Sequence, residues 1–143
     1  MSKNATYPKV TVSFFCHDGA GTYLFALRSN NCRDEHGKWD NGGGSLEFGE
    51  TVKHRLLTEL REEYNVTPLS YEFLGYRDVL REQKGVSTHW VSLDFRVLVD
   101  PTQVHNNEPH KFDQLAWFSL DKIPENTHSQ FAAAREQYAA KLI

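Results

Sequence analysis

Short runs of apolar and β-branched residues alternate with polar or glycine-containing turns along most of this chain. Such runs are typical of strands, and they predict strands at residues 10–16, 23–28, 71–79, 88–99 and 115–119. The pair Asp18-Gly19 between the first two runs is typical of a hairpin turn. The polar segment 29–41 is expected to form a loop, and residues 82–85 a second turn.

A helical pattern begins at residue 51, where Val52, Leu56, Leu60 and Tyr64 recur at every fourth position. Neither glycine nor proline interrupts this segment, and Pro68 prevents the helix from continuing.

A second helix is expected over residues 129–141, near the end of the chain. Strands on both sides of an embedded helix, followed by a terminal helix, indicate a mixed α/β fold. Because no repeat, low-complexity tract or long linker divides the sequence, residues 1–143 are expected to form a single domain.

The composition is that of an ordinary globular protein, with 39% hydrophobic and 24% charged residues and a formal net charge of −3. It lacks the concentrated Lys and Arg of proteins that bind nucleic-acid polymers, and no apolar run approaches the roughly 18 residues of a membrane span. The first eight residues contain no apolar signal core, and Cys16 and Cys32 are too few for a disulfide scaffold. We therefore expect a cytoplasmic domain with buried or neutral thiols that binds neither membranes nor nucleic-acid polymers.

The predicted central helix has an acidic face. Glu59, Glu62 and Glu63 are spaced i, i+3 and i+4, so a helix places their carboxylates together, beside its apolar stripe. Their mutual repulsion would be relieved by a hard divalent cation such as Mg²⁺, which prefers carboxylate oxygens and also binds phosphates. Taken alone, the same pattern also fits a solvated acidic surface.

A glycine-rich segment, residues 43–50, precedes this helix and leads into its N-terminus. Such a junction offers free backbone N–H groups and carbonyls beside the acidic face. Without the acidic helix, the glycines would indicate no more than an ordinary turn.

Together the loop and the helix resemble the signature of the Nudix hydrolase family, which includes MutT-like proteins: G-x5-E-x7-R-E-U-x-E-E-x-G-U, where U is a bulky aliphatic residue. Seven of its nine defined positions match, namely Gly44, Glu50, Glu59, Leu60, Glu62, Glu63 and Val66. Trp39 and the segment 115–124 also resemble family features, so the similarity extends over about residues 10–124. The resemblance implies an α/β/α sandwich around a mixed β-sheet.

The resemblance further implies Mg²⁺-dependent cleavage of the pyrophosphate linkage of a nucleoside diphosphate derivative, with Mn²⁺ as an alternative ion. The metal ligands it implies are Gly44, through its carbonyl oxygen, and Glu59, Glu62 and Glu63. Glu62 or Glu63 could act as the catalytic base, but a glutamate from a later loop often serves in the family, and Glu108 is the residue that fits.

Two more residues are assigned to substrate binding. Glu47 would hold the glycine-rich loop or contact metal-bound water, and Arg28, at the end of a predicted strand, would contact phosphate. A solvated surface arginine and a plain loop glutamate are the alternatives for Arg28 and Glu108. Among the aromatic residues, Trp90, Trp117 and Phe112 could stack on a nucleobase, although strand packing is the better interpretation for Trp117.

Two positions depart from the signature: Thr58 replaces its arginine and Asn65 its second glycine. Asn tolerates the left-handed conformation common after a helix end, so Asn65 is a mild change. The family's arginine is thought to orient a catalytic glutamate, which a threonine cannot do. We hypothesise that Arg55, four residues before Glu59, takes over this role; the alternative is a surface arginine loosely paired with Glu59.

The function expected from the sequence is hydrolysis of a small nucleotide, with a nucleoside triphosphate favoured by the shortness of the chain. ADP-ribose or a nucleotide sugar is the alternative substrate, and a monomer or small homodimer is expected. A catalytically silent nucleotide-binding module is the alternative from another functional class, with Thr58 marking a decayed site.

Overall fold

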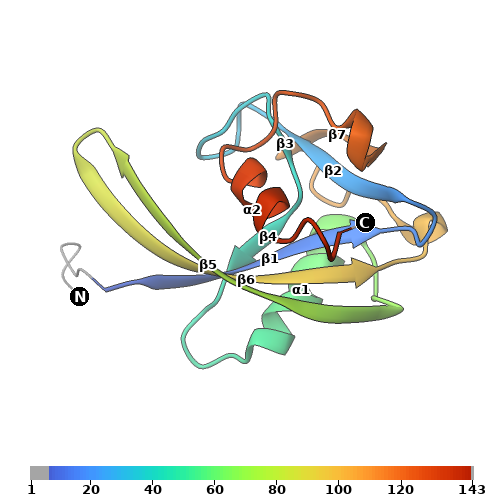
Figure 1. The fold of residues 1–143 in the computed structure, drawn as a ribbon, viewed down its shortest axis with the longest axis horizontal. Helices are drawn as coiled ribbons and strands as arrows, with labels where there is room; N and C mark the ends of the chain where they lie inside the picture. Colours follow the sequence, from blue (N-terminus) through green and yellow to red (C-terminus); the bar gives the residue numbers. More distant parts are fainter. Residues whose placement is uncertain (1–6, 143) are drawn as a thin grey trace.

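A computed structural model describes residues 7–142, which contain a seven-stranded mixed sheet and two α-helices (Figure 1). The strands are β1 (Lys9–His17), β2 (Thr22–Arg28), β3 (Trp39–Asp40), β4 (Gly43–Ser45), β5 (Ser70–Gln83), β6 (Val86–Leu98) and β7 (Phe112–Ser119). The helices are α1 (Val52–Tyr64) and α2 (Phe131–Gln137), with short 3₁₀ turns η1 (Pro101–Gln103) and η2 (Leu120–Lys122).

The sheet runs in the order β3-β2-β1-β6-β5, with β4 added to β1 and β7 added to β2. At its centre β1 pairs in parallel with β6, from Lys9 opposite Trp90 to His17 opposite Leu98, while the other named strand pairs are antiparallel. The predicted turn at Asp18 is present, but β1 and β2 pair only at His17 and Tyr23 before they diverge to other partners.

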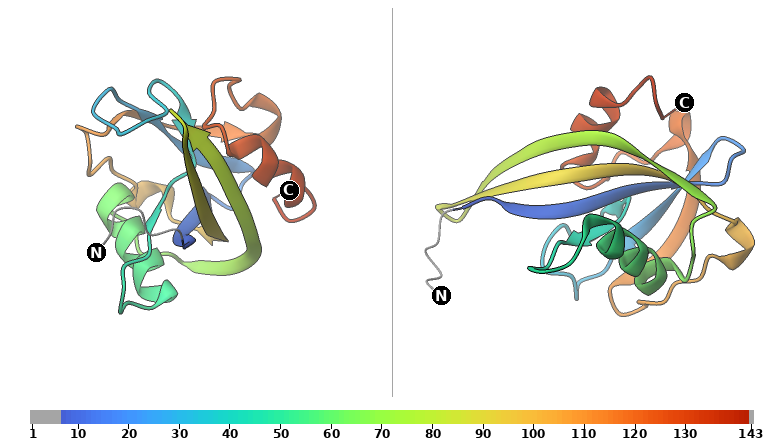
Figure 2. Two further views of the ribbon diagram at one scale, coloured as in Figure 1. Left: turned by 90° about the vertical axis from the view of Figure 1, so that its left-hand side faces the viewer. Right: turned by 90° about the horizontal axis from the view of Figure 1, so that it is seen from below.

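Two hydrophobic layers pack on opposite faces of the sheet. On one face, Phe14 packs with the apolar stripe of α1, and on the other, Phe15 packs with Phe131 and Tyr138 near α2. Figures 1 and 2 show the two helices on opposite sides of the sheet. The expected α/β/α sandwich is therefore confirmed, and alternation along β1 explains it, because successive residues point to opposite faces.

The β5–β6 hairpin is longer than predicted, and Figure 1 shows its far end projecting from the body of the molecule. Of residues 82–85, which the sequence predicts to form the turn, the first two instead continue the antiparallel ladder, in which Glu82 pairs with Ser87. Lys84 and Gly85, with φ of 54° and 76°, form the connection. Positive φ at both positions suits a two-residue hairpin turn.

The C-terminal helix is shorter than predicted: it ends at Gln137 rather than continuing to residue 141. The alanine-rich sequence favours helix, but tertiary contacts of Tyr138 and Leu142, which are 4% and 1% exposed, take over beyond the last turn. Within residues 7–142, neither helix is long and apolar enough to cross a membrane.

A buried charge network joins β5, β6 and the segment after α2. Asp94 is fully buried and accepts hydrogen bonds from Arg77 Nε at 2.8 Å, Arg77 Nη2 at 3.0 Å, Ser92 Oγ at 2.8 Å and Tyr138 Oη at 2.6 Å. Arg77 also donates to the carbonyl of Gln130 at 3.4 Å. The network fixes the C-terminal segment against the sheet.

We predict that Asp94→Ala destabilises the protein by about 3–5 kcal/mol, because it leaves the buried guanidinium of Arg77 without its carboxylate partner. Chemical denaturation measures the change in the free energy of unfolding. The matched control is Asp78→Ala on β5, whose exposed pair with His89 should contribute less than about 1 kcal/mol. Equal losses in the two variants would contradict a structural role for the Asp94 network.

Candidate active site

Helix α1 begins and ends at residues suited to those positions. The side chain of Thr51 accepts a hydrogen bond from the backbone N–H of His54 at 3.1 Å, as an N-cap does. Asn65 follows the last turn with φ 60° and ψ 33°, in the left-handed region. The expected tolerance of Asn at this position is confirmed, and the helix is held at both ends beside the glycine-rich loop.

Glu59 lies directly against Gly44 of β4. A Cβ at position 44 would lie 2.2 Å from Glu59 Oε1, so no side chain fits while this carboxylate keeps its place. The carbonyl oxygen of Gly44 accepts a hydrogen bond from Thr11 Oγ1 at 3.1 Å. The structure thus brings together two of the residues predicted to bind metal, one from the loop and one from the helix.

The three glutamates of α1 differ in burial. Glu63 is 3% exposed, Glu59 is half-buried and Glu62 is exposed. Among the described residues, no hydrogen-bond partner reaches the buried Oε1 of Glu63. Burial, reinforced by the charge of Glu59, raises the pKa of Glu63 well above its ordinary value. Burial also raises the pKa of Glu59. The charge of Glu62 adds to this rise, whereas Arg55 opposes it.

Arg55 links this helix to the loop before it. Its guanidinium donates from Nε and Nη2 to the two carboxylate oxygens of Glu50, at 2.6 and 2.9 Å, and from Nη1 to Glu59 Oε1 at 2.8 Å. The hydrogen bond from Arg55 lowers the pKa of Glu50 to about 2. This is a tight, bidentate arrangement rather than the loose surface pair considered as its alternative. Its partner Glu50 matches the family signature, but the sequence alone indicates no role for it.

The carboxylate of Glu50 also bonds to the backbone of the glycine-rich loop. Glu50 Oε1 accepts a hydrogen bond from the backbone N–H of Glu47 at 2.7 Å. The backbone of Glu47 therefore takes part in holding the loop, whereas its side chain is exposed to solvent.

The loop after η1 brings Glu108 to the far end of α1. The backbone N–H of Asn107 donates to the carbonyl of Glu63 at 3.2 Å, and its side-chain amide donates to the carbonyl of Arg61 at 3.0 Å. The charge of Glu108 contributes to the raised pKa of Glu63. Lys111, which the sequence reasoning did not single out, lies 3.7 Å from Glu108 in an ion pair.

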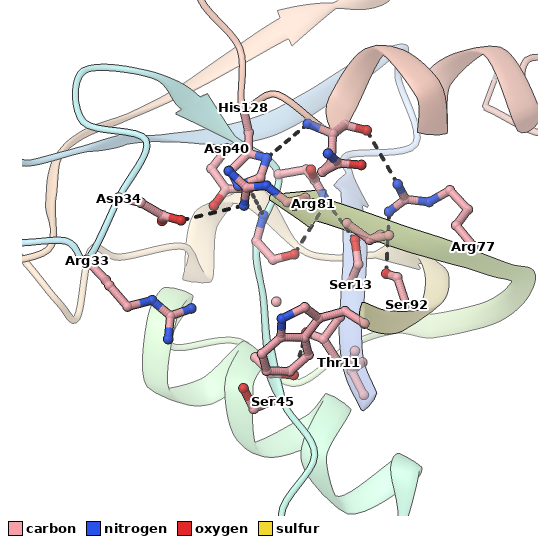
Figure 3. A pocket seen from close by; sticks show the side chains of 18 of the residues that line it. Thr11, Ser13, Arg33, Asp34, Asp40, Ser45, Arg77, Arg81, Ser92 and His128 are labelled. Carbon is pink, nitrogen blue, oxygen red and sulfur yellow. Dashed lines mark hydrogen bonds and ion pairs between the residues drawn. The ribbon is translucent and has the colours of Figure 1, made fainter. Parts of the chain in front are cut away.

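A cavity of about 260 Å³ opens beside β4, between the loop after β2 and the β5–β6 hairpin (Figure 3). Its lining includes the backbone of residues 42–44, together with Trp90, His128 and Gln130. Arg28 lines the cavity too, but its guanidinium is paired with Asp34 at 3.1 Å and Asp40 at 2.9 Å.

The other aromatic residues considered for base stacking belong to the core. Phe112 is buried in the α1 layer, and Trp117 packs against that layer from β7. Of the three, Trp90 is the one that lines the cavity. Cys16 and Cys32 are both buried free thiols, as expected.

The donors at this site fit a hard divalent cation. Within residues 7–142, no three His, Cys, Asp or Glu side chains are already gathered around a common point as a metal site. However, Glu63 carries a buried oxygen without a partner among the described residues, and the Glu59 carboxylate lies directly against the backbone of Gly44. Carboxylate and carbonyl oxygens are the ligands that Mg²⁺ prefers.

Comparison with known proteins agrees with this architecture. The NUDIX domain family model matches residues 7–140, and the chain therefore belongs to the Nudix family. A MutT NUDIX hydrolase from Burkholderia pseudomallei has a TM-score of 0.81 at 24% identity, with 92% of this chain and 98% of that chain covered. The MutT protein of Methanosarcina mazei Go1 has a TM-score of 0.78 at 24% identity, with 96% and 98% covered.

The oxidized purine nucleoside triphosphate hydrolases of Danio rerio and Mus musculus are 29% and 30% identical to this chain. Each match covers 62% of this chain and 53% of the relative, so the chain spans about half the length of these proteins. The NUDIX domain of Shewanella oneidensis NrtR, solved in complex with ADP ribose, has a TM-score of 0.75 at 19% identity, with 99% and 92% covered.

We predict that Glu63→Gln raises the melting temperature in EDTA at pH 8 by at least ~3 °C. At this pH the unfolded chain ionises Glu63 freely, whereas burial opposes the charge in the folded protein, and a neutral amide removes this cost. A shift of this size corresponds to about 1 kcal/mol. Thermal unfolding with EDTA and with Mg²⁺ measures it. Glu62→Gln, at an exposed position on the same helix, should leave the EDTA value nearly unchanged. The Mg²⁺-induced rise should be smaller in Glu63→Gln than in the native chain, and an undiminished rise would count against Glu63 as a ligand.

Proposed function

We propose that this chain is a Mg²⁺-dependent hydrolase that cleaves the pyrophosphate linkage of a nucleoside diphosphate derivative, with a nucleoside triphosphate as the favoured substrate. The observation that carries the proposal is the contact of Glu59 with the backbone of Gly44, together with the buried carboxylate oxygen of Glu63, one turn further along α1, that lacks a partner among the described residues. A buried, unpaired carboxylate is costly in a folded protein, and a bound cation supplies the missing interaction.

The groups proposed to hold the cation are the carbonyl of Gly44 and the carboxylates of Glu59, Glu62 and Glu63. When bound, Mg²⁺ neutralises phosphate charge and lowers the pKa of a water molecule. Mn²⁺ accepts the same oxygen ligands. The protein's own part is to hold these oxygens on one helix and one strand. The carboxylates alone would repel a polyanionic substrate, whereas with a cation bound the site would attract it.

Proton abstraction from the attacking water is assigned to a carboxylate of the same cluster. Glu62 is exposed and therefore accessible to water, while Glu108 is carried to the end of α1 by the loop that Asn107 anchors. Glu63 is better suited to a ligand than to a base, because it is buried. Arg28, at the cavity wall, would contact phosphate only with the part of its guanidinium that Asp34 and Asp40 leave free.

The substrate class is supported by the curated relatives, whose name describes hydrolysis of oxidized purine nucleoside triphosphates. The cavity beside β4, with Trp90 in its lining, has a volume of about 260 Å³ and could take a nucleobase. ADP-ribose is the second candidate, favoured by the likeness to the NrtR domain solved with that ligand.

A nucleotide panel tests the proposal. With Mg²⁺, we expect release of pyrophosphate or phosphate from at least one nucleoside triphosphate, and no product in EDTA. Glu62→Gln should lower kcat by ~10²–10⁴-fold if Glu62 is the base, the range typical of general base catalysis. A panel that includes ADP-ribose and yields no product, while nucleotides raise the melting temperature, would indicate a silent binding module instead.

Arg55 is proposed to be the positioning residue that replaces the missing signature arginine. We expect Arg55→Ala to lower kcat by ~10–100-fold, as removal of outer-shell partners of metal ligands commonly does. Thr58→Ala is the matched control one turn further along α1, and it should retain nearly native turnover.

The double variant Arg55→Ala/Thr58→Arg places the arginine where the family signature has it. We expect it to regain part of the activity lost in Arg55→Ala, with KM little changed throughout. Native turnover in Arg55→Ala would rule out the positioning role.

A further inference from the structure

Lys111 is a cation at the acidic site that neither the signature nor the expected roles include. It follows the loop that carries Glu108, and its Nζ lies 3.7 Å from Glu108 Oε2. Arg55, a cation on α1 itself, donates from Nε, Nη1 and Nη2 to Glu50 and Glu59. The two cations pair with different carboxylates, and the charges of both act on Glu59.

The backbone beneath Lys111 is anchored on several sides. Its N–H donates to the carbonyl of Glu108 at 2.9 Å, and its carbonyl accepts from the N–H of Ser29 at 2.8 Å and from Cys32 Sγ at 3.2 Å. The same loop is bonded to the end of α1 through Asn107. The backbone of Lys111 is therefore fixed relative to α1 by the loop that follows β2 and by the bonds between Asn107 and the helix.

The ammonium group of Lys111 has donors to spare. Among the described residues, no acceptor lies within hydrogen-bonding distance of Nζ, since the contact with Glu108 is an ion pair at 3.7 Å. The group also lies 5.6 Å from the centre of the Phe112 ring, a contact that uses no N–H bond. The side chain is 39% exposed, so solvent and ligands can reach it.

The charge of Lys111 also acts on the helix. It lowers the pKa of both Glu59 and Glu63, against the opposing effect of their burial. Lys111 therefore lies close enough to both carboxylates for its charge to act on them. An ammonium with free donors is a common partner of phosphate oxygens, to which it acts as a point charge.

We propose that Lys111 is a substrate-binding residue whose ammonium donates hydrogen bonds to a phosphoryl oxygen of the nucleotide at the acidic site. This inference rests on the proposed function, because it concerns the same site and the same class of ligand. Lys111 thereby supplies the positive charge that Arg55, committed to Glu50 and Glu59, does not offer.

The test compares Lys111→Met, which keeps the length of the side chain without its charge, with Lys111→Arg, which keeps the charge. Lys122→Met, at an exposed position in η2, is the matched control. Isothermal titration with α,β-methylene-ATP and α,β-methylene-ADP in Mg²⁺ measures binding without turnover. Steady-state kinetics on the best substrate and thermal unfolding complete the comparison.

We expect Lys111→Met to weaken binding of these analogues ~10-fold or more, the loss of one charge-assisted hydrogen bond to phosphate. It should lower kcat/KM at least as much and leave the melting temperature near native. Lys111→Arg should retain most of both properties, and Lys122→Met should match the native chain.

Native binding and kinetics in Lys111→Met would overturn the role of Lys111 and leave the hydrolase proposal standing. Equal losses in the Met and Arg variants, together with lowered melting temperatures, would overturn it in favour of a structural role. If the native chain cleaves no nucleotide, the proposed function fails; Lys111 then stands only if the native chain binds the analogues and Lys111→Met does not.

Discussion

The close approach of α1 to the backbone of β4 is the constraint on which this site depends. Glu59 lies where a side chain at position 44 would lie, so the helix reaches the strand only because residue 44 is glycine. On the same helix Glu63 is buried, and burial raises its pKa. Packing energy from Leu56 and Leu60, both fully buried, holds the carboxylates in positions that they would not adopt by themselves.

Charge compensation around these carboxylates is divided between elements. Arg55 forms ion pairs with both Glu50 and Glu59 and so connects the end of the glycine-rich loop to the helix. On the other side, the loop after η1 brings an acid and a base of its own, Glu108 and Lys111. In the sheet, Asp94 forms an ion pair with Arg77, which lines the cavity. Among the described residues, these pairs leave the buried Oε1 of Glu63 without a partner.

The departure from the family signature at Thr58 is accompanied by an arginine three positions earlier, Arg55, which bonds to Glu50 and Glu59. Positions 55 and 58 are one turn apart, and both side chains are partly buried near the N-terminal half of α1. Residues three apart on a helix are neighbours, which is why Arg55 is proposed to take the part of the arginine that the signature has at position 58. Its bidentate bond to Glu50 is the geometry for which guanidinium is suited and lysine is not.

Local pattern was sufficient for α1, for the positions of most strands and for the proximity of Gly44 to the acidic helix face, because each depends on short-range periodicity and spacing. The sequence could not predict that Glu62 and Glu63 would differ so strongly in burial, since that depends on the angle at which the helix packs on β4. It also could not pair Arg28 with Asp34 and Asp40, or carry Lys111 to Glu108 beside α1, because loop conformations and long-range contacts decide both. The sequence by itself determined which residues could bind a cation and phosphate; the tertiary structure decided which of them are buried, paired or free to do so, because burial and partner distance set the cost of each charge.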